Sequence, residues 1–157
     1  MSAAGAEAPV PTVEPGWVKV EEARTGRFAV HLLDGRHQLW ADEPAEVGGN
    51  DLGPGPYELL LMSLGACKSM TVRLYAERKQ WPLERVTVRL RHQRIHAQDC
   101  ADCETKEGML DRIECVLEFA GALDETQRAR LLDIAGKCPV HRTLTSEISI
   151  QSRLQEG

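Results

Sequence analysis

The sequence predicts a single domain of mixed class, in which short antiparallel strands come first, a long helix follows, and further strands and helices complete the chain. Near the N-terminus, Asp34-Gly35 separates two β-prone apolar runs, an arrangement typical of a tight hairpin. After Pro56, apolar residues recur at three- and four-residue steps to about Lys79, which indicates a helix. A length of 157 residues fits one domain with one core.

Three short strands are expected in the N-terminal part, at residues 17–20, 27–33 and 37–41. They would form a small antiparallel meander. Residues 1–15 are rich in alanine and proline, so we expect a disordered tail there and one domain over residues 16–157. Residues 47–56 hold four glycines and two prolines, which predicts a loop whose role is conformational.

The long helix is expected to be the centre of the fold. Pro56 suits its first turn, where the missing N–H of proline has no partner to lose. The first half of the helix is apolar nearly all round, which predicts burial in the core. The second half is amphipathic, and Trp81-Pro82 ends it.

Strands and helices alternate in the C-terminal half. Residues 85–96 and 109–119 alternate at a period of two, as half-buried strands do. Residues 147–154 are expected to form a final strand, with Ile148 and Ile150 facing inward.

Two helices are expected before this final strand. Asp124, with Gln127 three residues later, resembles a capping box that starts a helix running to about residue 135. Cys138-Pro139 then starts a short helix that runs to about residue 144. The expected order is therefore β-β-β-α-β-β-α-α-β.

Charge and hydropathy argue against two classes of partner. The formal net charge is -5, whereas nucleic acid binding needs a basic surface. The longest apolar stretch, residues 59–66, is less than half of the roughly 20 residues that a membrane-spanning helix needs. The N-terminal residues show no features of a secretory or transit signal, and we expect a cytoplasmic protein. Four arginines alternate with apolar residues and are expected on the solvent face of a strand: Arg85, Arg89, Arg91 and Arg94.

The five cysteines do not indicate a structural disulfide framework, because their number is odd and no secretion signal precedes them. They indicate core, metal-binding or catalytic thiols. Cys115 is in step with Ile113 and Leu117 along an apolar strand face, so we interpret it as a core residue.

Cys138 has two interpretations. It stands at the N-cap of a helix, where unpaired N–H groups lower the pKa of a thiol, and His141 and Arg142 add positive character. The alternative is an inert cysteine in a tight turn.

Cys67 also has two interpretations. A cysteine on an apolar helical face is typical of packing. However, Gly65 and Ala66 beside it permit close approach of another backbone or of a substrate, and Lys68 is adjacent.

His96, Cys100 and Cys103 form a third constellation. A Cys-x-x-Cys pair with a histidine four residues earlier offers three soft ligands, whereas structural zinc sites usually have four. The segment is a zinc site, a local redox pair or a polar hairpin loop.

Two motifs lie far apart in the chain: Pro-Tyr-Glu-Leu-Leu-Leu-Met-Ser-Leu-Gly-Ala-Cys at residues 56–67 and Cys-Pro-Val-His at residues 138–141. Together they resemble the OsmC/Ohr family of osmotically induced and organic hydroperoxide resistance proteins, most closely its OsmC-like branch. The similarity covers residues 17–154. It implies an α+β OsmC-like fold with antiparallel sheets and a long central helix, and an intertwined homodimer with active sites at the subunit interface.

The resemblance also implies a thiol-dependent peroxidase of oxidative-stress defence. Cys67, as a thiolate, would attack the O–O bond of an organic hydroperoxide and become a sulfenic acid, and Cys138 would condense with it to a disulfide. A dithiol reductant such as a dihydrolipoyl group would restore the pair, and no cofactor is expected. Apolar walls for an alkyl peroxide are expected from the long helix: Leu60, Leu61, Leu64 and Met70.

By the same resemblance, an arginine of the N-terminal meander activates the thiol. Arg27 matches this position best, and Arg36 is the alternative. The hydroperoxide resistance branch has a glutamate ten residues before the reactive cysteine, but this chain has Tyr57 there and Glu58 one residue later. One residue turns a helical side chain by about 100°, so Glu58 is the weaker candidate.

A second function remains open beside the peroxidase. The chain would then be a zinc- or thiol-binding module of OsmC-like fold without brisk turnover, with His96, Cys100 and Cys103 as ligands. Zinc would be its only cofactor.

Overall fold

The computed structural model describes residues 11–156. They fall into two compact units that divide between Leu59 and Leu60, and each unit is described by itself. Of the segment 1–15, predicted to be disordered, residues 1–10 lie outside the described residues, and residues 11–14 have no regular secondary structure.

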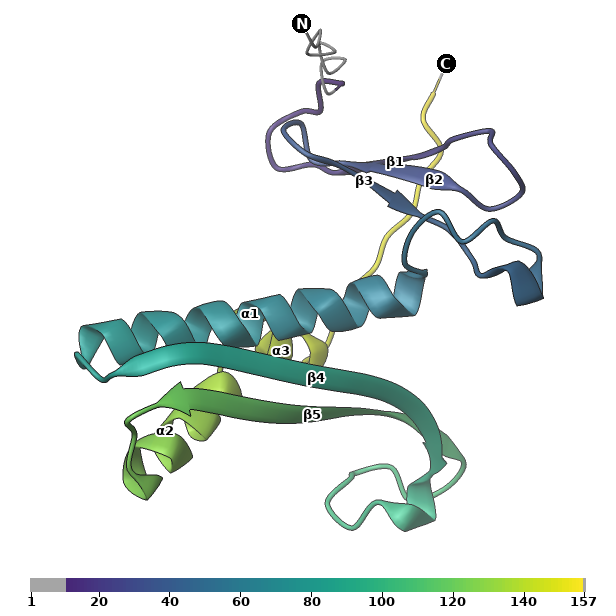
Figure 1. Ribbon diagram of the computed structural model, residues 1–157. Helices are drawn as coiled ribbons and strands as arrows, with labels where there is room; N and C mark the ends of the chain where they lie inside the picture. Colours follow the sequence, from purple (N-terminus) through teal and green to yellow (C-terminus); the bar gives the residue numbers. More distant parts are fainter. Residues whose placement is uncertain (1–10, 157) are drawn as a thin grey trace, which may run out of the picture. The chain divides into compact units, whose positions relative to one another are not determined.

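The first unit contains the predicted antiparallel meander (Figure 1). The strands β1 (Lys19–Glu22), β2 (Val30–Leu33) and β3 (Gln38–Ala41) pair in sequence order. All three predicted strands are thus confirmed, with bounds shifted by up to three residues at their ends. A short 3-10 helix, η1 (Ala45–Val47), follows.

The glycine-rich loop after η1 is held by a buried carboxylate. Asp42 accepts backbone hydrogen bonds from Glu43, Asn50 and Leu52 at 2.8, 3.1 and 3.4 Å. Gly53 passes so close to β3 that a Cβ there would lie 2.3 Å from the carbonyl oxygen of Trp40. Only glycine fits this approach, so the predicted conformational role of the loop is confirmed.

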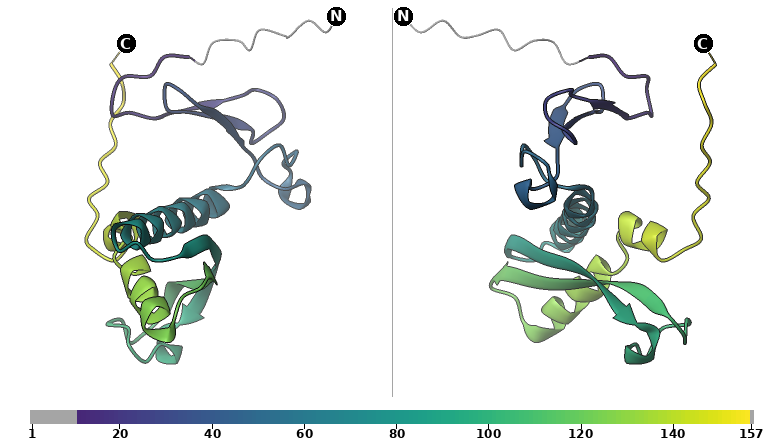
Figure 2. Two further views of the ribbon diagram at one scale, coloured as in Figure 1. Left: turned by 60° about the vertical axis from the view of Figure 1, so that its left-hand side comes forward. Right: turned by 90° about the vertical axis from the view of Figure 1, so that its right-hand side faces the viewer.

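The long helix α1 (Pro56–Arg78) enters the second unit, where two strands form an antiparallel ribbon. The strands are β4 (Leu83–His96) and β5 (Met109–Gly121), joined through the 3-10 helix η2 (Ala97–Asp99). The helix lies along this ribbon, and the right-hand view of Figure 2 shows it nearly end-on. A Cβ on Gly65 would lie 2.8 Å from Leu90 Cδ1, so the missing side chain lets α1 pack closely on β4.

Two further helices complete the second unit, α2 (Glu125–Ala135) and α3 (Pro139–Leu144). The predicted capping box is present, because Asp124 accepts from the Gln127 amide at 2.7 Å and the Gln127 side chain accepts from the Asp124 amide at 3.0 Å. The core lies between α1, α2 and the ribbon and comprises Val72, Ala76, Leu83, Phe119, Leu123, Leu131 and Ala135.

Two sequence predictions are wrong for this unit. The final strand at residues 147–154 is absent, and Ile148 and Ile150 are 50% and 85% exposed instead of facing inward. An extended segment becomes a strand only when a neighbouring backbone pairs with it, and no described residue of the chain does so here.

The long helix is also not buried all round. Four small or apolar residues, spaced four apart, form an exposed line along it: Met62, Ala66, Met70 and Leu74. We call this line the α1 stripe. Composition predicted burial of the first half of the helix. Within a single chain, however, only the faces of α1 that pack against the ribbon, α2 and α3 are covered. Among the described residues, no helix combines the length and the apolar character needed to cross a membrane.

Candidate active site

Cys67 and Cys138 meet in the second unit. Cys67 lies in the middle of α1 and is half-buried, whereas Cys138 is fully buried. The amides of two adjacent residues, Val140 and His141, donate to one sulfur each, which places the two sulfurs side by side. Residues 71 positions apart in the sequence are therefore partners in space.

The first turn of α3 provides hydrogen bonds to both sulfurs. The Val140 amide donates to Cys67 Sγ at 3.5 Å, and the His141 amide donates to Cys138 Sγ at 3.4 Å. Cys138 is the N-cap and Pro139 the first helical residue, as the sequence predicts. The cap acceptor is thus a sulfur in place of the usual side-chain oxygen.

The two thiols have unequal environments. Burial raises the pKa of Cys138, the His141 amide lowers it, and the neighbouring Cys67 raises it again. Cys138 is therefore held as a protonated thiol that solvent does not reach. Cys67 is the more accessible sulfur of the pair.

Lys68 is a buried cation beside this pair. Its side chain is only 3% exposed, and Nζ donates to the Ala135 carbonyl at 3.0 Å and to His141 Nδ1 at 2.9 Å. No carboxylate forms an ion pair with it among the described residues. A buried charge is costly without an opposite charge nearby, and a thiolate at the Cys67–Cys138 pair would provide one. The charge of Lys68 lowers the pKa of Cys138.

His141 is neutral, which corrects the positive character assigned to it from the sequence. Burial lowers its pKa, and the charge of Lys68 lowers it further. An ammonium group can only donate, so Nδ1 of His141 is the acceptor and the neutral ring carries its proton on Nε2. Positive charge at the site comes from Lys68.

A pocket of about 220 Å³ adjoins His141 between α1, β5 and α3. Its lining residues are Leu64, Asp111, Ile113, Cys115, His141, Leu144 and Thr145. Four residues of α1 were predicted to form apolar walls, and of these only Leu64 lines this pocket. Cys115 is a lining residue that the sequence placed only in the core, and burial raises the pKa of its thiol.

The residues proposed from the resemblance as the activating arginine and glutamate lie in the first unit. The guanidinium of Arg27 lies over the ring of Phe28, 4.9 Å from its centroid. The Arg36 amide donates to Asp34 at 2.8 Å within a turn. Glu58 accepts from the Gly55 amide at 2.5 Å and so caps the start of α1.

Cys100 and Cys103 are joined by a disulfide, with their Cα atoms 5.5 Å apart. Asp102 completes a group whose possible ligand atoms lie within 4.8 Å of one another. His96, the third ligand of the zinc hypothesis, is exposed and is not in this group.

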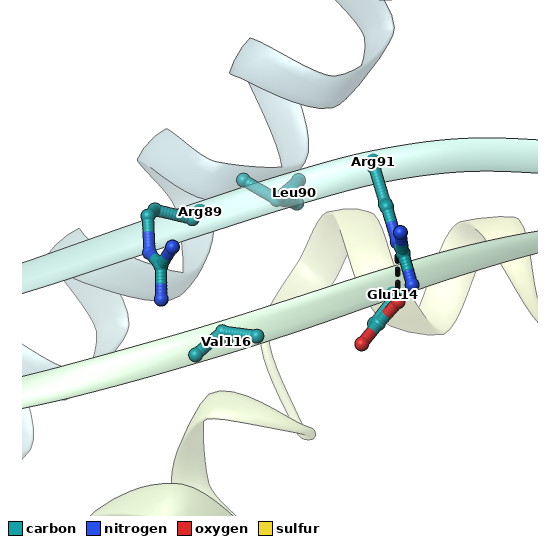
Figure 3. Close-up of a pocket in the computed structure, with 5 residues that line it drawn as sticks. All are labelled: Arg89, Leu90, Arg91, Glu114 and Val116. Carbon is teal, nitrogen blue, oxygen red and sulfur yellow. Dashed lines mark hydrogen bonds and ion pairs between the residues drawn. The ribbon is translucent and has the colours of Figure 1, made fainter.

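A second pocket, of about 320 Å³, lies on the ribbon and is lined by Arg89, Leu90, Arg91, Glu114 and Val116. Figure 3 shows Arg91 and Glu114 facing each other across the two strands. The two side chains form an ion pair, with 2.5 Å between Arg91 Nε and Glu114 Oε2. Arg85, Arg89, Arg91 and Arg94 are all exposed, which confirms their predicted place on a solvent face.

The family model for OsmC-like proteins matches residues 48–153, about two thirds of the chain. The chain belongs to the OsmC-like protein family. The resemblance found in the sequence motifs is thereby confirmed. No curated protein matches the chain.

Solved structures share the fold of this OsmC-like protein. An organic hydroperoxide resistance protein OsmC from Legionella pneumophila is 22% identical, with a TM-score of 0.58 over 88% of this chain and 92% of that one. An OsmC-like protein from Mycoplasma pneumoniae is 21% identical, with a TM-score of 0.59 over 83% and 88%. An organic hydroperoxide resistance protein from Elizabethkingia anophelis is 16% identical, with a TM-score of 0.57 over 82% and 86%. The α+β OsmC-like fold is confirmed.

The neutral state of His141 predicts a pH dependence of stability. Its pKa in the folded protein lies below the ordinary 6.5, so the unfolded chain takes up the proton first as the pH falls. The contribution of His141 is complete above pH 6.5 and decreases below it. His141→Asn keeps an acceptor for Lys68 but cannot titrate. The free energy of unfolding is measured in urea for both proteins. Between pH 8 and pH 5 it should decrease more in the wild type than in His141→Asn. A difference that does not change with pH would contradict the neutral state of His141.

Proposed function

We propose that this protein is a thiol-dependent peroxidase of the cytoplasm that reduces organic hydroperoxides in oxidative-stress defence. One observation carries the proposal: an accessible and a buried thiol lie side by side at the first turn of α3, beside a buried ammonium group that has no carboxylate partner among the described residues. A thiolate is the nucleophile in such chemistry, and a nearby cation favours it.

The first step takes place at Cys67, the accessible sulfur. Its thiolate attacks one oxygen of the hydroperoxide, the O–O bond breaks, and Cys67 becomes a sulfenic acid while an alkoxide leaves and takes up a proton. His141 lines the adjoining pocket and carries a proton on Nε2. In this proposal it donates a hydrogen bond to the leaving oxygen.

The second step resolves the sulfenic acid. The Cys138 sulfur attacks Cys67 Sγ, water leaves, and a disulfide forms between the two residues. The burial of Cys138 supports this role, because solvent peroxide does not reach it before Cys67 is oxidised. A dithiol such as a dihydrolipoyl group then reduces the protein disulfide by thiol–disulfide exchange and is itself oxidised to a disulfide. Two electrons and two protons pass to the protein.

The activating cation in this proposal is Lys68. It lies next to Cys67 in α1 and already influences the pKa values of Cys138, Cys115 and His141. Arg27, which the resemblance implies, is the second candidate, and Glu58 is its proposed partner. Against a relay through Glu58 stands its hydrogen bond to the Gly55 amide, which already engages the carboxylate.

The pocket beside His141 supports an alkyl peroxide as substrate. Leu64, Ile113 and Leu144 provide apolar walls, and His141 and Thr145 provide hydrogen-bonding groups. Two of the similar structures are named organic hydroperoxide resistance proteins, which agrees with this class of substrate.

We further propose that two chains form the homodimer implied by the resemblance, and that the α1 stripe is part of its interface. Met70, in the middle of a 23-residue helix, is 71% exposed, and Met62 is 57% exposed. Contiguous exposed apolar surface of this kind marks interaction sites. A second chain would also offer a backbone edge to residues 147–154, whose sequence predicts a strand.

Oxidation with one equivalent of an organic hydroperoxide tests the thiol pair. Cys67→Ser should abolish peroxide consumption, whereas Cys138→Ser should allow one turnover and leave Cys67 overoxidised, since no thiol resolves it. Disulfide mapping by mass spectrometry should find Cys67 bound to Cys138 in the wild type. The Cys100→Ser, Cys103→Ser double variant, which changes two cysteines outside the pocket, is the control and should keep turning over. Reduced Cys67 and Cys138 with untouched peroxide, or repeated turnover without Cys138, would sink the mechanism.

Lys68→Met tests the source of the activating charge. The apolar side chain fills the buried site, but the thiolate loses its cation, so the rate of peroxide reduction at pH 7 should fall about ten-fold and its rise with pH should move to higher pH. Lys68→Arg should keep part of the rate. Arg27→Met is the matched variant. If Arg27→Met lowers the rate of peroxide reduction while Lys68→Met leaves it unchanged, the activating charge belongs to Arg27. Rates are measured by stopped-flow with the purified proteins.

Met70→Glu tests the interface. A charge in the α1 stripe should shift the protein from dimer to monomer in analytical ultracentrifugation, because a carboxylate is costly to bury against apolar surface. Leu132→Glu, on an α2 residue that is 55% exposed, is the matched control and should remain dimeric. A monomeric wild type, or an unchanged dimer in Met70→Glu, would refute the proposed interface.

A further inference from the structure

We infer that Cys100 and Cys103 form a second redox centre, a reversible disulfide that exchanges with an uncharged dithiol. The inference is independent of the proposed peroxidase chemistry of Cys67 and Cys138. It starts from the loop between β4 and β5, where the two sulfurs are bonded to each other.

The loop is built to hold one cysteine in place. The Ala97 amide donates to the Gly108 carbonyl at 2.8 Å and closes the base of the loop, and the Cys100 amide donates to the Ala97 carbonyl at 3.2 Å. Ala97 and Cys100 are 1% and 5% exposed. Two residues later Cys103 comes back to Cys100 at a Cα separation of 5.5 Å, within the range that a disulfide requires.

The two sulfurs differ in access. Cys100 is buried, whereas Cys103 is half-buried. An incoming thiolate must reach one sulfur of a disulfide and expel the other, so Cys103 is the atom attacked and Cys100 the leaving group. Asp102 Oδ1 lies 3.5 Å from Cys100 Sγ, where it can accept a hydrogen bond from the Cys100 thiol of the reduced form.

The pair is remote from the other thiols of its own chain. Leu90 pairs with Cys115 beside the active-site pocket, and His96 pairs with Met109 at the end of the ribbon, six residues further along each strand. At about 3.3 Å per residue, the end of the ribbon that carries the loop lies roughly 20 Å from Cys115, whereas a disulfide joins Cα atoms less than about 7 Å apart. Its exchange partner is therefore an external thiol.

The exchange balances with a dithiol alone. One thiolate of the reductant attacks Cys103 Sγ, forming a mixed disulfide and releasing Cys100, which takes up a proton. The second thiol of the reductant then closes a ring with the first and releases Cys103. Two electrons and two protons pass to the protein, and the reductant leaves as a cyclic disulfide.

The charge of the loop selects among thiols. Four carboxylates surround the pair in the sequence, at Asp99, Asp102, Glu104 and Glu107, against a single lysine, Lys106. Anionic thiols are repelled by this arrangement, and uncharged ones are not. A metal site is disfavoured, because the sulfurs are already bonded to each other and the group offers one further ligand, Asp102, without His96.

The test is a redox titration of the full-length Cys67→Ser, Cys138→Ser double variant, in which neither proposed peroxidase thiol contributes. The protein is equilibrated with mixtures of reduced and oxidised dithiothreitol, quenched with acid and alkylated. Mass spectrometry of the peptide with residues 100–103 should show one disulfide converting to two thiols in a single two-electron step. Adding Cys103→Ser should abolish that step. A pair that stays reduced or stays oxidised over the whole range overturns the inference.

Two further measurements test the class of ligand. At equal thiol concentration and pH, dithiothreitol should reduce the pair at least about ten-fold faster than glutathione, which is anionic and forms no ring. Equal rates would overturn the assignment of an uncharged dithiol. Zinc is also measured in wild-type protein purified without chelator. Stoichiometric zinc that is lost in Cys103→Ser would show a metal site at this loop and overturn the inference of a redox centre.

Discussion

One buried ammonium group connects the helices of the second unit. Lys68 extends from α1 and donates both to the Ala135 carbonyl at the end of α2 and to His141 in α3. The first turn of α3 also directs its amides at the sulfurs of Cys67 and Cys138. Because a buried cation must keep its hydrogen-bond acceptors, the placement of α3, and with it the environment of both thiols, depends on this side chain.

Features fixed by neighbouring residues could be predicted from the sequence. The Asp34-Gly35 hairpin, the Asp124–Gln127 capping box and the N-cap at Cys138 each involve groups within a few positions of one another, and all three are present. The pairing of Cys67 with Cys138 came from the family motifs, because nothing local to either cysteine indicates its partner.

Features that depend on distant groups could not be predicted. Lys68 and His141 are 73 positions apart, and the charge of His141 follows from burial and from Lys68, so its sequence neighbours gave the wrong state. Composition made the first half of α1 apolar nearly all round, but only contacts in space decide which face is covered. Alternation in residues 147–154 gave a strand pattern without a backbone partner. Position 57 likewise holds tyrosine where the hydroperoxide resistance branch has glutamate, and only the structure shows that Glu58 caps its own helix.

The burial of Lys68 also sets a limit on protein engineering. Replacing the lysine by an apolar side chain of similar volume removes the cost of burying a charge, but it leaves the Ala135 carbonyl and His141 Nδ1 as buried acceptors without their donor. The same exchange removes the positive charge next to the thiol pair. Under the proposed role of Lys68, selection for resistance to heat or denaturant alone would not detect a loss of thiol reactivity, so selection at this position has to monitor both properties together.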